Sequence, residues 1–269
     1  MDRSYWIKQQ PSEALYQDLL WSRPENRSFA GKLLVIGGHA QGFTRPAEAY
    51  ARAEQAGAGT VRVVLPDVLQ KTLGRAFLGA EFAPSTPSGS FATSALGEFV
   101  PLAAWADAVL LAGDLGRNSE TAILLEKFIE QYTGQLTITC DAVDYMVATP
   151  YPILQRPDTL LVLSFAQLQK LGVAIKYSNA FTYSMDLLHL IDALYELTKR
   201  YKMTIITKHL DTILLAVDGQ VVTTKVIAPL PIWRLRFAAQ ASIWWLQNPT
   251  KPLEALTTAI HQALHETVT

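Results

Sequence analysis

The residues whose types could bind or transfer a charged group occur in four short stretches. Each stretch directly follows an apolar run. Glycine lets a backbone approach a ligand closely, a carboxylate can accept a proton, and a lysine at the end of a strand suits a phosphate. Together they predict a site for a small anionic ligand. The stretches are Gly37–Gly42, Ala112–Asn118, Cys140–Asp141 and the Lys208 that ends MTIITK.

Each stretch also has a plainer interpretation. The spacing after Gly37 and Gly38 is neither a dinucleotide fingerprint nor a P-loop, so these glycines can simply make a tight turn. Gly116 can open a helix whose free N–H groups bind an anion, or Asn118 can be an ordinary helix cap. Asp141 can cap the next turn, and Lys208 can be a solvated surface lysine.

The elements that must position these residues alternate between strands and helices. Apolar, β-branched runs predict strands at residues 32–36, 60–65, 107–111, 136–140, 159–163 and 203–207. Helical spacing of apolar residues predicts helices at 46–55, 119–132 and 184–201. This alternation is typical of an α/β fold with a mostly parallel sheet and helices on both faces. Ligands bind at the carboxyl ends of such strands, so the four stretches should meet there.

The pattern changes after Lys208. Two apolar runs, 212–217 and 220–224, flank Asp218-Gly219, which is a strong hairpin turn sequence. Two helices, 232–247 and 252–265, should end the chain, and 85–94 reads as a polar, linker-like loop. Without a clean boundary, we expect one domain over residues 1–269, with residues 1–30 as an N-terminal extension that packs on it.

Composition narrows the function classes. The chain has 269 residues, of which 49% are hydrophobic, and a formal net charge of −1, so nothing favours binding to nucleic acid or anionic lipid. Cys140 is the one cysteine, which fits a reducing compartment. The N-terminus does not read as a signal peptide, and no apolar run is long enough for a membrane span. We therefore expect a cytoplasmic protein with a small-molecule partner.

The four stretches, in this order and with a hairpin behind the lysine, resemble the ADP- or ATP-dependent NAD(P)H-hydrate dehydratases. This family is a branch of the ribokinase superfamily. The similarity runs from about Gly31 to Thr224 and includes the AGAG at 56–59. ADAVLLAGDLGRNSET is similar to the segment with the family's G-P-G-L-G loop, and LTITCDA to its strand ending in D-A. MTIITKHLDTILL is similar to its K-G-x-x-T nucleotide segment.

The resemblance implies a ribokinase-like fold and a repair reaction. In that reaction ADP or ATP, with Mg²⁺, phosphorylates hydrated NADH or NADPH, and elimination of the phosphate restores the nicotinamide. The implied nucleotide-binding residues are Lys208 and Thr212. The residues implied for the substrate pocket are Gly37, Gly38, Asp114, Gly116, Asp141 and Ser164.

One departure from the family concerns catalysis directly. The family has a G-G-x-G-D stretch after the hairpin, whose bare N–H groups hold the phosphoryl oxygens and whose Asp deprotonates the attacking hydroxyl. Here residues 225–234 read KVIAPLPIWR, with no glycine and no acid. No Asp or Glu occurs between Asp218 and Glu254, so a small shift in alignment does not restore the base.

Other family positions have also changed. Asp114 stands in place of the middle glycine of G-P-G-L-G, and His209 in place of the glycine after the lysine. Ser164-Phe165-Ala166-Gln167 replaces H-P-G-E, and Val143 replaces an acid. Loss of a general base alone typically costs ~10²–10⁴-fold in rate. We therefore expect the family reaction to be lost or strongly impaired.

Two further functions stay open beside a divergent dehydratase. One is a non-catalytic protein that binds a nucleotide or dinucleotide, or serves in an assembly. The other is a divergent small-molecule kinase of the same superfamily. Residues 232–246 are apolar on nearly every face, which favours core packing over a homo-oligomer contact. Arg234 in this segment can reach an anion, and is a third candidate nucleotide-binding residue. His261 and His265 lack a third metal ligand, so we expect no metal there.

Overall fold

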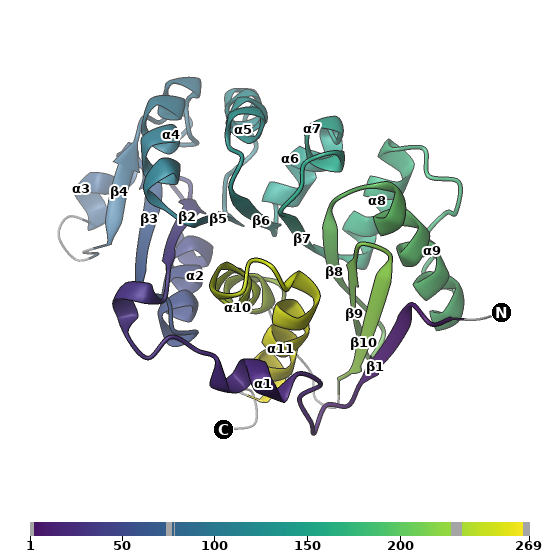
Figure 1. Cartoon of the computed structure of the whole chain (residues 1–269). Coiled ribbons are helices and arrows are strands. Elements are labelled where there is room, and N and C mark those ends of the chain that lie inside the picture. The colour runs from purple at the N-terminus through teal and green to yellow at the C-terminus, as the bar shows by residue number, and fades with distance from the viewer. Residues whose placement is uncertain (1–2, 74–76, 78, 227–232, 266–269) are drawn as a thin grey trace.

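A single sheet runs through the protein in the computed structural model, which describes residues 3–73, 77, 79–226 and 233–265 (Figure 1). Its order is β1-β10-β9-β8-β7-β6-β5-β2-β3-β4. Only β9 runs antiparallel to its neighbours, β8 and β10. The strands are β1 Trp6–Gln9, β2 Lys32–Gly37, β3 Thr60–Pro66, β4 Ala80–Ala83, β5 Ala108–Gly113, β6 Gln135–Thr139, β7 Thr159–Ser164, β8 Thr204–His209, β9 Thr212–Val217 and β10 Gln220–Lys225.

Helices cover both faces of the sheet (Figure 1). One face carries α1 Gln17–Trp21, α2 Thr44–Gln55, α10 Trp233–Gln247 and α11 Pro252–His265. The other carries α4 Leu96–Trp105, α5 Ser119–Gln131, α6 Ala142–Ala148, α7 Tyr151–Leu154, α8 Phe165–Ala174 and α9 Leu187–Arg200. The short α3, Gln70–Leu73, lies beside β4, and single 3₁₀ turns occur at Arg27–Phe29, Asp67–Leu69 and Thr93–Ala95.

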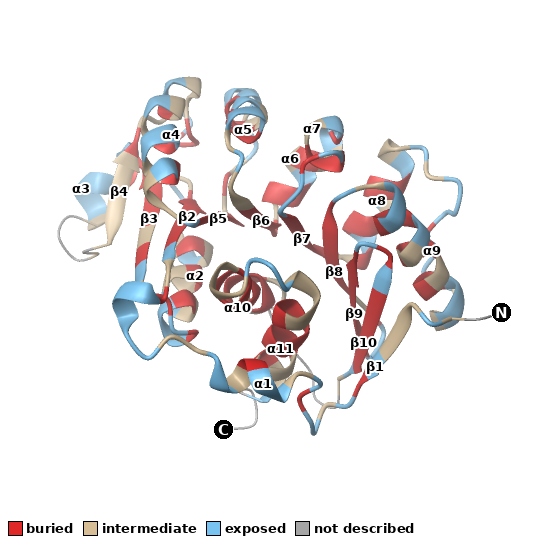
Figure 2. Ribbon diagram, viewed as in Figure 1, coloured by how far each residue is buried: buried red, intermediate tan, exposed pale blue. Residues whose placement is uncertain are grey.

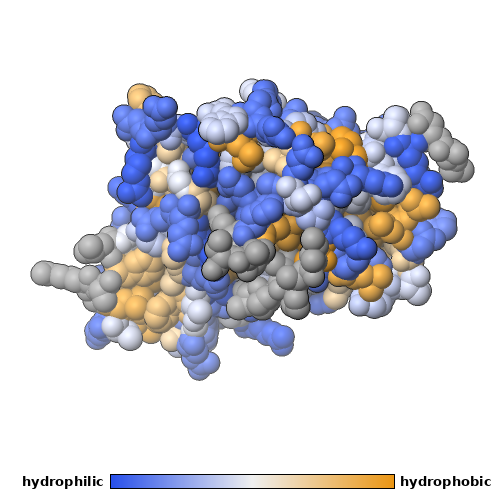
Figure 3. Space-filling model, turned by 90° about the horizontal axis from the view of Figure 1, so that it is seen from below, coloured by the Kyte–Doolittle hydropathy of each residue, from blue (hydrophilic) through white to orange (hydrophobic). Residues whose placement is uncertain are grey.

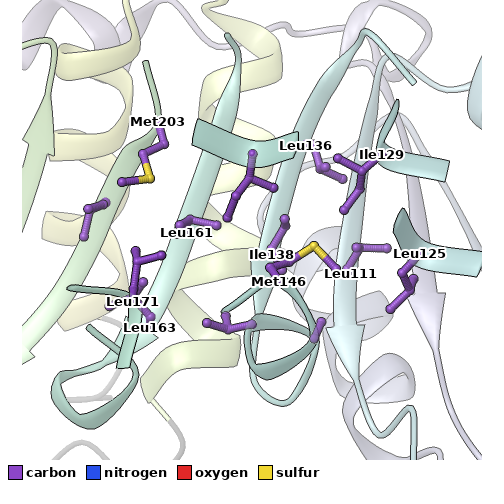
Figure 4. Close-up of a cluster of buried hydrophobic side chains, with 14 of the residues drawn as sticks. Leu111, Leu125, Ile129, Leu136, Ile138, Met146, Leu161, Leu163, Leu171 and Met203 are labelled. Carbon is purple, nitrogen blue, oxygen red and sulfur yellow. The ribbon is translucent and has the colours of Figure 1, made fainter. Parts of the chain in front are cut away.

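The central strands are buried on both faces, which explains why they read as continuous apolar runs. All six residues of β5 are buried. Alternate side chains feed two apolar layers, one under each set of helices. Figure 4 shows part of the layer that α5, α6 and α8 cover, where Met146 meets Leu111 and Ile138. Buried residues are therefore concentrated in the strands of the sheet and in α10 (Figure 2).

The predicted mostly parallel α/β fold is confirmed, as is the hairpin of β9 and β10. Asp218 and Gly219 both have positive φ angles, 45° and 72°, as a two-residue hairpin turn of this kind requires. Prediction missed β1 and β4, which are four-residue edge strands with little periodic pattern. It also missed α4, which holds Pro101, a residue that usually argues against a helix interior.

The aromatic segment near the C-terminus is core, as the sequence favoured. In α10, Leu235, Phe237, Trp244 and Trp245 are buried. On the surface of the molecule, in the view of Figure 3, apolar residues form several separate areas between hydrophilic ones. None of the described helices combines the length and the apolar character that crossing a membrane requires.

The N-terminal segment joins the sheet through β1 and is tied to helix α9 by an ion pair. Nε and Nη2 of Arg3 each lie 2.9 Å from a carboxylate oxygen of Asp192 on α9. Tyr5 donates to the same carboxylate at 2.5 Å and stacks on Tyr195. These donors favour the charged form, so the Arg3 hydrogen bond above all lowers the pKa of Asp192 from 3.8 to about 2.

We expect Asp192→Asn to lower the free energy of unfolding at neutral pH by up to about 2 kcal/mol. Because the folded-state pKa is depressed, the carboxylate stabilises the fold above its unfolded pKa and loses that effect as pH falls through about 2. The difference between variant and wild type should therefore shrink between pH 4 and pH 2. Urea titrations across this range, with exposed Asp18→Asn as control, measure it. A difference that does not depend on pH would contradict the assignment.

Candidate functional site

The parallel strands β2, β5, β6, β7 and β8 end at one edge of the sheet and bring the four predicted stretches together. Gly37 at the end of β2 pairs with Gly113 at the end of β5. Ser164 at the end of β7 pairs with Lys208 on β8. This edge is the candidate site, because carboxyl ends of parallel strands are where open α/β sheets bind ligands.

An arginine that sequence analysis did not select lies at the centre of this edge. Nη1 of Arg45, in the first turn of α2, lies 2.7 Å from Oδ1 of Asp141 and 3.3 Å from Oδ1 of Asp114. Oδ2 of Asp114 also accepts the Arg45 backbone N–H at 2.9 Å. Arg45 therefore neutralises charge from both strand-end carboxylates.

The carboxylate of Asp141 also holds the neighbouring loop. Its Oδ1 accepts the backbone N–H of Asp114 at 2.8 Å, and its Oδ2 accepts that of Leu115 at 2.9 Å. Asp114 is itself in the left-handed region, with φ of 57°. The plainer interpretation of Asp141, a residue that holds a turn, therefore matches its contacts.

The loop from Asp114 to α5 depends on Gly116. Its φ is 74°, and a Cβ there would lie 2.6 Å from both the His39 ring and Ser90 Oγ. A side chain at this position would clash and strain the backbone. Asn118 accepts the Glu120 N–H at 2.8 Å, which is the ordinary cap that the sequence offered as an alternative to anion binding.

Residues 85–94, which the sequence suggested to be a linker-like loop, are instead docked over the edge. Ala40 N–H donates to the Gly89 carbonyl at 2.9 Å, and the Asn118 amide donates to Ser88 Oγ at 2.9 Å. Phe91 is fully buried. Polar composition alone did not reveal this packing, because the contacts come from segments far apart along the chain.

A cavity of about 640 Å³ opens between the beginnings of α2 and α10. Helix α2 contributes Thr44, Arg45 and Glu48 to its lining, and α10 contributes Trp233 and Arg234. A second cavity of about 520 Å³ lies across the edge, where Gly116, Arg117, Tyr145 and Lys170 are among its lining residues. Both have a size suited to a small ligand.

Gln167 links the two helical layers at this edge. Its Nε2 donates to the Cys140 carbonyl at 2.7 Å and to Asp144 Oδ2 at 3.0 Å. Its Oε1 accepts from Nη1 of Arg234 at 2.8 Å. Ser164, a predicted substrate-pocket residue, forms a capping box with Gln167 at the start of α8.

The two predicted nucleotide residues of the hairpin point to opposite faces of the sheet. Lys208 pairs with Ile213, whose side chain belongs to the layer under α10 and α11. Thr212 pairs with His209 and so faces the other layer. Within the described part of the chain, the Lys208 side chain has no ion pair or hydrogen bond. Thr212 donates to Oδ1 of Asp211 at 3.1 Å.

His209, which stands where the resembling family has glycine, fills space in the core. It is 3% exposed and lies against Phe165, with ring centroids 4.6 Å apart, and against Tyr183 at 5.6 Å. The Pro-containing stretch at 227–232, on which the predicted loss of the anion-binding glycines falls, lies outside the described residues.

Sequence analysis missed Arg45 and Glu48, and treated Gln167 only as a changed position. Arg45 offered one detectable feature: a cation in the first turn of a helix is electrostatically unfavourable unless an anion lies nearby. Among the described residues no three His, Cys, Asp or Glu side chains gather as metal ligands. Asp114 and Asp141 do not fit a Mg²⁺ site, because Arg45 already bridges them.

No protein-family model matches the chain, and no curated protein is similar to it. Solved structures do match. A ribokinase-like superfamily protein from Enterococcus faecalis is 16% identical with a TM-score of 0.70, over 98% of this chain and 88% of that one. An ADP/ATP-dependent NAD(P)H-hydrate dehydratase from Bacillus subtilis, co-crystallised with ATP and Mg²⁺, is 10% identical with a TM-score of 0.58, over 90% and 81%.

A phosphomethylpyrimidine kinase from Clostridium difficile is 9% identical with a TM-score of 0.55, over 88% of this chain and 99% of that one. These likenesses extend over nearly the whole chain, and they join a dehydratase and a kinase through one architecture. The protein therefore has the ribokinase-like α/β fold.

Proposed function

We propose that this chain binds a nucleotide or dinucleotide and that the phosphoryl-transfer reaction of its dehydratase relatives is lost or strongly impaired. The proposal rests on one observation: Arg45 binds both carboxylates at the strand ends, Asp114 and Asp141. Nη1 of Arg45 lies within 3.3 Å of an oxygen of each carboxylate. The backbone N–H groups of Asp114 and Leu115 also donate to Asp141.

A general base must be free to take a proton from the attacking hydroxyl. The oxygens of Asp141 already accept hydrogen bonds from the Arg45 guanidinium and from two main-chain N–H groups, so they are not free to accept a hydroxyl proton of a substrate. The segment that holds the base in the resembling family contains no acid here, from 225 to 234. Neither the chain before α10 nor the strand ends therefore offers the required group.

Nucleotide binding is supported by the cations that remain on the α10 side of the edge. Lys208 and Ser164 are register partners there. Arg234, in the first turn of α10, donates to Gln167, which forms a capping box with Ser164. The similarity in fold to a dehydratase co-crystallised with ATP and Mg²⁺ points to the same class of ligand.

A divergent small-molecule kinase is the second candidate, and Glu48 favours it. This acid lines the 640 Å³ cavity and has only a loose ion pair, with Arg52 Nε at 3.9 Å. It is thus the one acid of the described lining that Arg45 does not hold. A base acting from α2 would be unrelated to the one the family uses.

We expect Lys208→Ala to weaken ATP and ADP binding by about tenfold, which corresponds to roughly 1.4 kcal/mol. The reason is the loss of the ammonium that faces the α10 side of the edge. Titration calorimetry with each nucleotide measures the effect. Lys202→Ala, which removes an exposed lysine just before β8, is the matched control. Equal heats for wild type and Lys208→Ala would remove Lys208 from the site.

A further inference from the structure

The charged side chains that line the 640 Å³ cavity differ in whether an opposite charge lies beside them. Arg45 is neutralised by Asp114 and Asp141, and Glu48 has Arg52 within 3.9 Å. Arg234 is different, because the partner that holds its Nη1 is the neutral amide of Gln167. Within the described lining, Arg234 is therefore the cation whose charge no carboxylate balances.

Only one orientation of the Gln167 side-chain amide satisfies its hydrogen bonds, and in that orientation its oxygen faces Arg234. Both of its amide hydrogens have acceptors, the Cys140 carbonyl and Asp144 Oδ2. Its oxygen accepts from the Ser164 N–H at 3.1 Å and from Arg234. Turning the amide over would set its N–H groups against the N–H donors of Ser164 and Arg234. Gln167 is only 5% exposed, so water does not replace these bonds easily.

Trp233 adds an apolar surface beside the guanidinium. Its ring lines the same cavity and is only partly buried, while its edge contact with Phe237, at 6.0 Å between centroids, fixes it on α10. An indole face packs well against a flat aromatic ring. A guanidinium next to it suits a phosphate or carboxylate, with which it forms paired hydrogen bonds.

We propose that this cavity binds a nucleoside monophosphate, with its base on the Trp233 ring and its phosphate on Arg234. Gln167 is then the positioning residue, because it holds the Arg234 guanidinium. The inference rests on the proposed nucleotide binding but uses residues other than Lys208. Gln167 serves by being an amide: it fixes the guanidinium and leaves its charge for the ligand. A carboxylate there would fix the guanidinium and neutralise it.

The test is titration calorimetry of the whole chain with AMP, adenosine and inorganic phosphate. AMP should bind more tightly than either fragment, because the ring and the acid group are held by different residues. Arg234→Gln should weaken AMP binding by about tenfold or more and leave adenosine little changed. Arg200→Gln, which removes an exposed arginine of α9, should leave AMP binding unchanged.

Gln167→Glu separates positioning from a merely structural role. At neutral pH its carboxylate should neutralise Arg234 and weaken AMP binding about tenfold. The Arg234 guanidinium would favour the charged form of this carboxylate, so it should become protonated, and again resemble the neutral amide, only as pH falls below the ordinary range of a glutamic acid. The ratio of wild-type to variant affinity should therefore return toward one. Comparison at each pH removes the titration of AMP itself.

Three results would overturn the inference. These are AMP binding no tighter than phosphate, AMP binding insensitive to Arg234→Gln, or a Gln167→Glu defect that does not change with pH. Lys208→Ala keeps the two proposals apart. If AMP affinity depends on Lys208 and not on Arg234, the proposed function stands and this inference falls. If ATP affinity ignores Lys208 while AMP affinity depends on Arg234, the opposite holds.

Discussion

Hydrated NADPH should be restored by this protein, with ADP or ATP and Mg²⁺ present, at least about 100-fold more slowly than by a dehydratase that has a general base. The recovery of NADPH absorbance and the release of phosphate from the nucleotide measure this directly. The Bacillus subtilis dehydratase, which has the same fold, is the positive control under the same conditions.

The expected deficit has two physical sources. Neither strand-end carboxylate is free to accept the proton of the attacking hydroxyl, because Asp114 and Asp141 are bound to Arg45 and to main-chain N–H groups. The transferred phosphoryl group also lacks the glycine amides of the resembling family, since residues 225–234 contain none. Each oxyanion donor lost typically costs about 10²-fold or more, so the combined effect is large.

Glu48→Gln decides between the two candidate functions if some turnover is found. A trace rate that the variant keeps would be background, consistent with a binding protein. A normal rate that falls by about 10²-fold or more in Glu48→Gln would identify this acid as the base and favour the divergent enzyme. A normal rate in both proteins would contradict the argument that the carboxylates at this edge are unavailable.

The fold was predictable because most of its central strands are continuous apolar runs in the sequence. Residues 33–36 and 108–111 are buried on both faces, so each reads as an unbroken apolar run that follows a single exposed charged residue. Asp218-Gly219 predicted its hairpin for a backbone reason, since both residues adopt positive φ. The edge strands β1 and β4 escaped prediction, because four residues with partial burial carry no period.

The candidate site was predictable only in part. Its location followed from the strand ends, and Asp114, Asp141 and Lys208 do lie along that edge. Their partners did not follow, because Arg45 lies 69 residues from Asp114 and 96 from Asp141 along the chain. The opposite directions of Lys208 and Thr212 could have been predicted from the hairpin register, which pairs Thr212 with His209.

Several positions at which this sequence differs from the resembling family contribute to the stability of the fold. Asp114 accepts the Arg45 N–H at the start of α2, and His209 fills the space between Phe165 and Tyr183. Gln167, which aligns with an acid of the resembling family, joins α6, α8 and α10 by hydrogen bonds. Groups committed to packing and to hydrogen bonds in this way are poor candidates for proton transfer, which links the fold to the proposed loss of catalysis.

Trp244→Ala should lower the free energy of unfolding by about 3–5 kcal/mol, because it empties a site in the middle of the core. Trp244 is fully buried in α10. Its Nε1 donates to Oε1 of Gln262 on α11 at 3.2 Å, and the Arg23 guanidinium lies 4.3 Å from its ring centroid. The substitution therefore removes contacts among α10, α11 and the N-terminal segment together.

Urea titration measures the change, and Trp21→Ala is the matched control. Trp21 is 89% exposed on α1, so its removal should shift stability by no more than about 0.5 kcal/mol. Light scattering on the same samples tests the alternative that the aromatic helix joins subunits. If Trp244→Ala dissociated an oligomer while the unfolding free energy of each subunit stayed the same, α10 would be an interface. Because α10 also carries Trp233 and Arg234 at its first turn, a core role for Trp244 would mean that packing fixes the cavity wall.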